Sequence, residues 1–337
     1  MTSIEPLIRY EGISGQGFAH PADRAAMAAL RSVPPLNAAI RKFTEMSYER
    51  RLRQLFLGQA VRISGEQLPA VWALERECAY TLDVEPCPSL YVTQAPVGQA
   101  MTIGANQPVI LVMSGLVGSY SEAELRSVLA HETGHVLADH VAFTTAFVTV
   151  TRILHGVFQG QPLVGIPLLA LYHALLEWSR AAELTADRAA ALVAGDPLVP
   201  CRTLMRVAGG PLEGLELDAF IRQATEYHEE SDPFARWSRF FAEIQTTHPF
   251  PVRRVRELVT WVSSGEYDRI RAGQYLRRGQ EPPPSAEFER AFEHYRGRFA
   301  SIVERAGSGI QNIADRIGSW LDGARRGEGE DFGPEGG

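Results

Sequence analysis

A histidine–glutamate motif offers the clearest chemistry in the sequence. Residues 131–135 read His-Glu-Thr-Gly-His, which places His131 and His135 four positions apart. In a helix, residues four apart lie about 40° from each other on one face, so both imidazoles can reach one tetrahedral zinc ion. Glu132 lies one step round from His131 and can hold a metal-bound water. The spacing predicts a hydrolytic zinc site, against the alternative of a surface helix with two histidines.

A catalytic zinc ion needs a third protein ligand, and the motif does not supply one nearby. Ala138 and Val141 occupy the positions at which longer versions of the motif have glycine and a third histidine. His140 lies about 140° round the helix from His135 and is not expected to join the site. Because no acidic residue occurs between His140 and Leu176, the third ligand is expected further downstream.

The next strong helix carries three carboxylates, Glu177, Glu183 and Asp187. Glu183 and Asp187 share a face, whereas Glu177 lies about 120° away from Glu183. Zinc sites commonly use one carboxylate on the metal and another that accepts the outer N–H of a ligand histidine. Alanines around this pair, and Gly134 in the motif, would let the two helices approach closely. Taken alone, Glu183 is more typical of a surface acid on an alanine-rich helix, and the histidine motif reverses this in favour of the ligand role.

Three motifs in chain order resemble a known family. They are SEAELRSVLAHETGH, then SRAAELTADRAA, then THPFPVRRV, and the resemblance covers about residues 88–258. Together they resemble the HtpX and CAAX-prenyl-protease group of gluzincin zinc metallopeptidases. The resemblance implies an α+β, mostly helical fold with a zincin-like core. That core has a small sheet, an active-site helix with the HExxH motif and a helix with the third ligand, and it binds one zinc ion per chain.

The resemblance also implies roles for individual residues. The zinc ligands would be His131, His135 and Glu183, with Glu132 as the catalytic base. Asp187 would lie behind the ligands and support them. His248, in the His-Pro segment, is the counterpart of a histidine that stabilises the transition state. The segment here reads THPFP rather than the commoner T-H-P-P, so a turn-stabilising role for His248 is the alternative.

The sequence departs from the membrane members of that family. They place two transmembrane helices between the HExxH motif and the third ligand. Residues 153–176 carry no formal charge, but the interval 141–182 is too short for two spans of about 20 residues and a turn. Glycines and prolines interrupt it further. We expect an apolar helical hairpin that is buried in the protein or touches a bilayer surface.

Composition excludes several other functions. The net charge is 33 − 40 = −7, so no basic field is present to hold nucleic acid. Only one lysine occurs, Lys42, which removes P-loop and Schiff-base chemistry near any motif. Three cysteines are too few for a disulfide framework, and the N-terminus lacks an apolar run of signal-peptide length. We therefore expect a cytoplasmic protein with, at most, peripheral membrane contact.

Hydrophobic periodicity predicts the elements that position these residues. Helices are expected at 20–60, 67–82, from Ser121 through the histidine motif, at 168–193, 213–228 and 233–245, and after the THPFP segment. Ser121 and Glu124 form an S-x-x-E capping box that starts the motif helix. Strands are expected at 90–93 and 109–113. The second strand, VILVM, is a candidate sheet edge for an extended peptide, with a buried central strand as the alternative.

Along the chain we expect four segments. They are an N-terminal helical segment (1–70), a zincin-like metallopeptidase domain (71–265), a C-terminal helical extension (266–326) and a disordered tail (327–337). The expected function is a zinc metalloendopeptidase that acts on peptides or unfolded proteins, in protein quality control. The alternatives are a catalytically silent zinc or peptide-binding module and a latent enzyme. In a latent enzyme, the apolar 153–167 segment, His155, His173 or Cys201 would fill the fourth zinc position.

Overall fold

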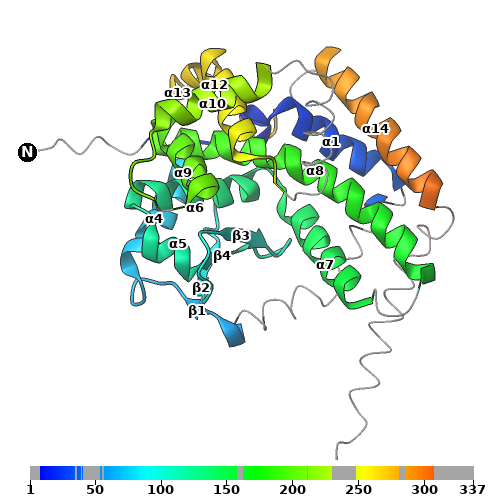
Figure 1. The fold of residues 1–337 in the computed structure, drawn as a ribbon, viewed down its shortest axis with the longest axis horizontal. Helices are drawn as coiled ribbons and strands as arrows, with labels where there is room; N and C mark the ends of the chain where they lie inside the picture. The colour runs from blue at the N-terminus through cyan, green and yellow to red at the C-terminus, as the bar shows by residue number, and fades with distance from the viewer. Residues whose placement is uncertain are drawn as a thin grey trace, which may run out of the picture.

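A computed structural model of the chain describes most of its residues. They are residues 8–34, 36–38, 40, 54, 57–157, 162–210, 212–229, 248–280 and 286–306. The described part is mostly helical with one four-stranded sheet, as the sequence predicts (Figure 1). The helix expected at 233–245 and the tail at 327–337 lie outside the described residues.

The first helix is shorter than expected. The helical prediction over 20–60 holds only in part, because α1 spans Pro21–Ser32 and ends there, and helical residues resume at 34, 36–38, 40, 54 and 57–59. Val33 has φ −94° and ψ 102° and precedes Pro34, and a residue before proline is disfavoured in the helical region. Helix α4 (Pro69–Thr81) closely matches the prediction for 67–82.

The sheet has the order β1-β2-β4-β3. Its strands are β1 (Val61–Arg62), β2 (Ser89–Thr93), β3 (Ala100–Ile103) and β4 (Val109–Met113). β4 pairs parallel with β2 and antiparallel with β3, so the VILVM strand is central and the expectation of an edge strand is wrong. Its continuous apolar run is typical of a strand that is buried on both faces. The two edge strands are β1 and β3, and neither was predicted from the sequence.

Two helices carry the histidine and carboxylate motifs. After the short α5 (Ser114–Ser119), the capping box of Ser121 and Glu124 starts α6 (Glu122–Leu137), as predicted. α8 (Pro162–Ala194) includes the helix expected at 168–193 and packs along α6. A Cβ atom added at Gly134 would lie 2.5 Å from the Cβ of Ala189, so only glycine permits this approach. The two helices therefore meet at the motif itself.

The apolar hairpin consists of α7 (Val141–Val157) and the first half of α8. Phe143 and Phe147 of α7 and Trp178 of α8 belong to one buried cluster with Leu30 of α1. Phe299 of α14 (Ala286–Ala306) completes this cluster, and α14 lies beside α1 (Figure 1). Among the described residues, no helix is both long and apolar enough to cross a membrane.

The second half of α8 is covered by four further helices. They are α9 (Leu198–Gly209), α10 (Leu217–Glu229), α12 (Pro251–Ser263) and α13 (Glu266–Arg271). Leu192 of α8 shares a buried cluster with Leu204, Trp261 and Tyr267 from these helices. The His-Pro segment directly precedes α12, so this packing brings its residues to the middle of α8. The division of the chain into four segments stays a prediction.

Candidate metal centre

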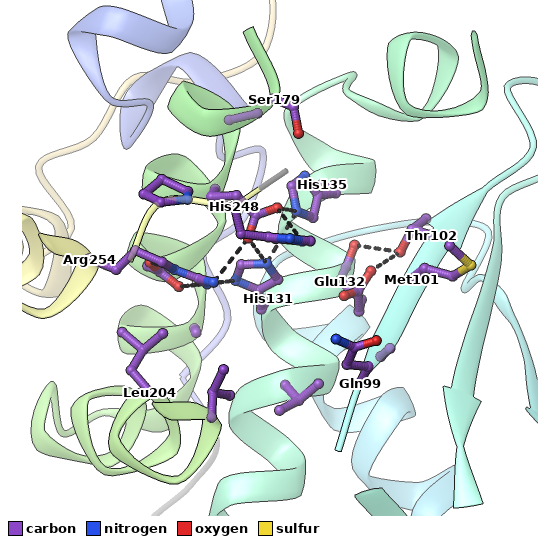
Figure 2. A pocket seen from close by; sticks show the side chains of 18 of the residues that line it. Gln99, Met101, Thr102, His131, Glu132, His135, Ser179, Leu204, His248 and Arg254 are labelled. Carbon is purple, nitrogen blue, oxygen red and sulfur yellow. Dashed lines mark hydrogen bonds and ion pairs between the residues drawn. The ribbon is translucent and has the colours of Figure 1, made fainter. Parts of the chain in front are cut away.

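Three metal-ligand side chains meet between α6 and α8. The Nε2 atoms of His131 and His135 are 3.2 Å apart, and each lies 3.4 Å from a carboxylate oxygen of Glu183. The donors of a tetrahedral centre with bonds of about 2.1 Å are separated by about 3.4 Å. The two histidines face different oxygens of Glu183, and one donor atom from each of the three side chains lies within 4.8 Å of the other two, which is close enough for all three to bind one metal ion. Figure 2 shows both histidines on α6 facing the same point.

The outer nitrogen of His131 contacts a buried carboxylate. Its Nδ1 lies 3.1 Å from Oδ1 of Asp187, one turn after Glu183 on α8. An N–H on Nδ1 that donates to Asp187 leaves Nε2 unprotonated and available to a metal. The geometry thus matches the position expected of Asp187 from the helix spacing.

Arg254 holds the carboxylates in place, and the sequence analysis missed it. Its Nε and Nη2 donate to Asp187 at 2.8 and 2.6 Å, and its Nη1 lies 3.1 Å from Glu183 (Figure 2). Burial alone would raise the pKa of Asp187, but the charge of Arg254 holds it below its usual value. Burial likewise opposes ionisation of Glu183, yet His248, Arg254 and His131 hold its pKa well below the usual range. Both carboxylates are therefore charged acceptors.

His135 contacts another histidine, where His131 contacts a carboxylate. His140 was not expected to join the site, yet its Nδ1 lies 2.9 Å from Nδ1 of His135. The helical projection fails because α6 ends at Leu137 and Asp139 has φ +61°, a left-handed turn that sends the chain back toward the motif. His140 does not supply a metal ligand atom. Its Nε2 lies 2.9 Å from Oδ2 of Asp23, on α1.

Glu132 lies beside the ligand cluster and outside it. Its Oε2 accepts a hydrogen bond of 2.6 Å from the hydroxyl of Thr102, on the edge strand β3 (Figure 2). The carboxylate is buried, and β3 packs against α6. This arrangement leaves Glu132 next to the metal position without making it a ligand, which is the placement that a general base requires.

His248 approaches the cluster from the surface. It precedes α12, its side chain is 57% exposed, and its Nε2 lies 3.7 Å from Oε1 of Glu183. Figure 2 shows its ring near His131 and His135. The structure therefore brings His248 to the same centre as the motif residues, although it belongs to a separate segment.

A cavity of about 680 Å³ opens over these residues. One side is formed by Gln99 and by Met101 and Thr102 of β3, and another by Leu204 and Val207 of α9. His248 and the prolines that follow it line the rim. The cavity thus runs along a strand edge and passes the metal ligands.

Other candidate residues lie apart from the cluster. Glu177 pairs with Arg180 and Arg298, as expected for a carboxylate on a different face from Glu183. Cys201 is buried in the hydrophobic cluster with Leu204, and His173 is exposed on α8. The side chain of His155 and most side chains of the 153–167 segment lie outside what the structure describes. Neither Cys201 nor His173 is among the residues that line the cavity.

Comparison with known proteins gives a consistent picture. The model of peptidase family M48 matches residues 74–262, which include every residue of the cluster from His131 to Arg254. The chain belongs to peptidase family M48. The resemblance to HtpX-type peptidases that the three motifs indicated is confirmed, and membership supports a metallopeptidase function. Asp23 lies outside the matched residues.

Named relatives agree with this family. The chain is 36% identical to plastoglobule-localized metallopeptidase 48, chloroplastic, of Arabidopsis thaliana over 274 residues, which cover 80% of this chain and 78% of the relative. It is 25% identical to a protease HtpX homolog of Burkholderia multivorans over 234 residues, which cover 62% of this chain and 80% of that relative. A protease HtpX homolog of Ralstonia pickettii is 27% identical over 207 residues, covering 54% and 70%. No solved structure matches the chain.

Proposed function

We propose that this M48 peptidase is a zinc-dependent metalloendopeptidase with one zinc ion held by His131, His135 and Glu183. The observation that carries the proposal is that one donor atom from each of the three side chains lies within 4.8 Å of the other two. The two histidine Nε2 atoms are 3.2 Å apart, and each lies 3.4 Å from a different oxygen of Glu183. The Nδ1 atoms of both histidines are engaged elsewhere, which directs both Nε2 atoms to the shared point. Three protein ligands leave a fourth position for water or substrate.

The residues around the centre divide the chemistry. A zinc ion held by His131, His135 and Glu183 would act as a Lewis acid and would lower the pKa of a water molecule bound to it to about 7. Glu132 accepts the proton of the attacking water and delivers it to the leaving amine. The hydroxyl of Thr102 fixes the orientation of that carboxylate through its 2.6 Å hydrogen bond. His248 donates a hydrogen bond to the carbonyl oxygen as negative charge develops on it.

The edge strand supports a peptide or unfolded-protein substrate. β3 pairs only with β4 among the described strands, and its residues line the cavity beside Glu132. An extended peptide could add to this edge by backbone hydrogen bonds, which do not depend on side-chain identity. The proposal is therefore an endopeptidase with weak side-chain preference, suited to protein quality control. A silent binding module would have no need of Glu132 and its supporting hydroxyl.

Partners and location follow from less direct observations. The net charge of −7 supports the absence of a nucleic-acid partner. A cytoplasmic location and peripheral membrane contact stay predictions, and the Arabidopsis relative is named for a chloroplast compartment instead.

The proposal is tested by metal analysis together with cleavage of an unfolded protein such as casein. Wild-type protein should contain one zinc ion per chain and cleave casein. Glu132→Gln should retain zinc and the fold but lose cleavage, because the base is removed while the ligands stay. Glu122→Gln, an exposed change on the same helix, is the matched control and should cleave normally. A Glu132→Gln protein that cleaves at the wild-type rate would contradict the proposal.

A further inference from the structure

A line of buried polar groups leads from the metal centre to the N-terminal helix. His135 contacts His140 through their Nδ1 atoms at 2.9 Å, and His140 contacts Asp23 at 2.9 Å. His140 is 0% exposed and Asp23 is 1% exposed. Trp178 packs edge-on against the His140 ring, with the ring centroids 5.5 Å apart. This line, which we call the relay, is therefore closed to water.

When zinc is bound, the hydrogen bonds of the relay can be donated in one direction only, from His135 to Asp23. A neutral imidazole has one N–H donor and one acceptor nitrogen, and a histidine that binds a metal through Nε2 carries its proton on Nδ1. His135 must then donate from Nδ1, so the Nδ1 of His140 must accept. His140 consequently carries its proton on Nε2 and donates it to the carboxylate of Asp23. Any other arrangement places two donors or two acceptors face to face.

Asp23 is itself held as an acceptor from several sides. The hydroxyl of Thr185 on α8 donates to its Oδ2 at 2.6 Å, and the backbone N–H of His20 donates to Thr185. Asp23 lies in the first turn of α1, where the helix dipole favours a negative charge. A carboxylate oxygen, Oδ1, is nevertheless buried with no hydrogen-bond partner among the described residues. Burying a charge this way is costly and a hydrophobic residue would pack at lower cost, which argues for a role beyond packing.

We propose that Asp23 and His140 are positioning residues of the metal centre: Asp23 sets the tautomer of His140, and His140 sets that of His135, so that Nε2 of His135 faces the metal. This inference rests on the proposed zinc site. It makes α1, which lies outside the segment matched by the M48 family, a necessary part of that site. The alternative outcome is that the relay only ties α1 to α6.

The first test uses wild-type protein loaded with zinc and labelled with ¹⁵N-histidine. Metal analysis comes first, because protein that binds no zinc would contradict the proposed function rather than the relay. In zinc-loaded protein, two-dimensional ¹⁵N spectra should show His140 protonated on Nε2 alone and His135 protonated on Nδ1. The His140→Gln variant assigns the His140 signals among the nine histidines. A His140 that carries its proton on Nδ1 while zinc is bound would overturn the proposal.

The second test compares zinc affinities by competition with a chelator. His140→Phe keeps an aromatic ring against Trp178 but removes both nitrogens, and it should lower the affinity at least about tenfold. His140→Gln has an oxygen that accepts from His135 and an amide that donates to Asp23, so it should restore most of the affinity. The control is Asp139→Asn, which changes an exposed neighbour that pairs with Arg31 and should leave the affinity unchanged.

Combining variants distinguishes a relay from independent supports. Because Asp23 acts only through His140, the double variant Asp23→Ala/His140→Phe should bind zinc no more weakly than His140→Phe alone. If the double variant instead lost zinc affinity by the product of the two single losses, Asp23 would not act through His140 and the proposal would be overturned. If His140→Gln binds zinc as weakly as His140→Phe, while both unfold at the wild-type temperature, the positioning role is wrong. If His140→Phe fails to fold, the ¹⁵N spectra of wild-type protein and the zinc affinity of His140→Gln still test the positioning role of His140.

Discussion

The two histidines that we propose as zinc ligands in this M48 peptidase are oriented in different ways. The Nδ1 of His131 lies against the carboxylate of Asp187, which Arg254 holds, and all three residues fall within the family-matched segment. The Nδ1 of His135 reaches a carboxylate only through His140, and that carboxylate belongs to α1, outside the segment. A direct charged acceptor interacts more strongly than one behind a neutral ring. We call His131 with Asp187 and Arg254 the His131 side, and His135 with His140 and Asp23 the His135 side. The His131 side should therefore contribute more to metal binding.

The first prediction concerns Glu183, which contacts both His131 and His135. Glu183 lies 3.4 Å from each histidine, so Glu183→Ala takes away the common third ligand and should lose most of the zinc. Glu177→Ala is the control on the same helix, since Glu177 pairs with Arg180 and Arg298, and it should keep the zinc. Zinc content measured after removal of excess metal checks both. Equal zinc in the two variants would show that Glu183 is not a ligand.

The second prediction compares the two sides directly. Asp187→Ala should lower zinc affinity by about a hundredfold, more than His140→Phe, because it leaves Arg254 facing His131 with no carboxylate between them. The two supports act in parallel on different histidines, so the double variant Asp187→Ala/His140→Phe should show losses that multiply, to about a thousandfold. Chelator competition measures each affinity. A smaller loss for Asp187→Ala than for His140→Phe would reverse the ranking.

The His131 side could be predicted from the sequence, whereas the His135 side could be predicted only in part. His131, His135 and Asp187 follow from helical spacing alone, because the capping box fixes where α6 begins and both helices are regular. The relay does not follow, since the left-handed turn at Asp139 ends the helical projection, and Asp23 is 117 residues from His140. Arg254 is 67 residues from Asp187, and only its place in the third motif hinted at it. Tertiary packing decides such contacts.

The sheet gives the same lesson. The apolar runs of β2 and β4 are readable as strands, but their central position in the sheet depends on β1 and β3, which pair with them at either side. β3 has only four residues, Ala-Met-Thr-Ile, and shows no strong alternation to separate it from a loop. It nevertheless supplies the edge and Thr102, the hydroxyl that contacts Glu132.

The third prediction concerns His248, which supports neither ligand histidine. It approaches Glu183 from the exposed rim, so His248→Ala should leave zinc affinity near the wild-type value. Its contact with the carbonyl oxygen strengthens only in the transition state, so the turnover number should fall by about a hundredfold with little change in the Michaelis constant. Steady-state kinetics on a peptide substrate provide the measurement, with exposed His173→Ala as the control. Wild-type turnover would return His248 to a turn-stabilising role.

The last prediction asks whether both sides depend equally on the approach of α6 to α8. The Cβ introduced by Gly134→Ala would meet the Cβ of Ala189 at 2.5 Å, so the helices must separate, at a cost of about 1–3 kcal/mol in the free energy of unfolding. Gly118→Ala, on α5 with no heavy atom within 4 Å of the added Cβ, is the control and should not destabilise the protein. Denaturant unfolding of both variants measures the cost.

The histidine ¹⁵N signals of zinc-loaded Gly134→Ala then show which of the two sides is more affected by separation of the helices. Glu183 and Asp187 both lie on α8, so a shift of that helix moves the shared ligand and the support of His131 together. The support of His135 comes from the residues after α6 and from α1, and Thr185 of α8 contacts it only through Asp23. The ¹⁵N signal of His131 should therefore change more than that of His135. A larger change at His135 would mean that α1 moves together with α8. In that case the relay would shift His135 when the helices separate, and would not hold it in place.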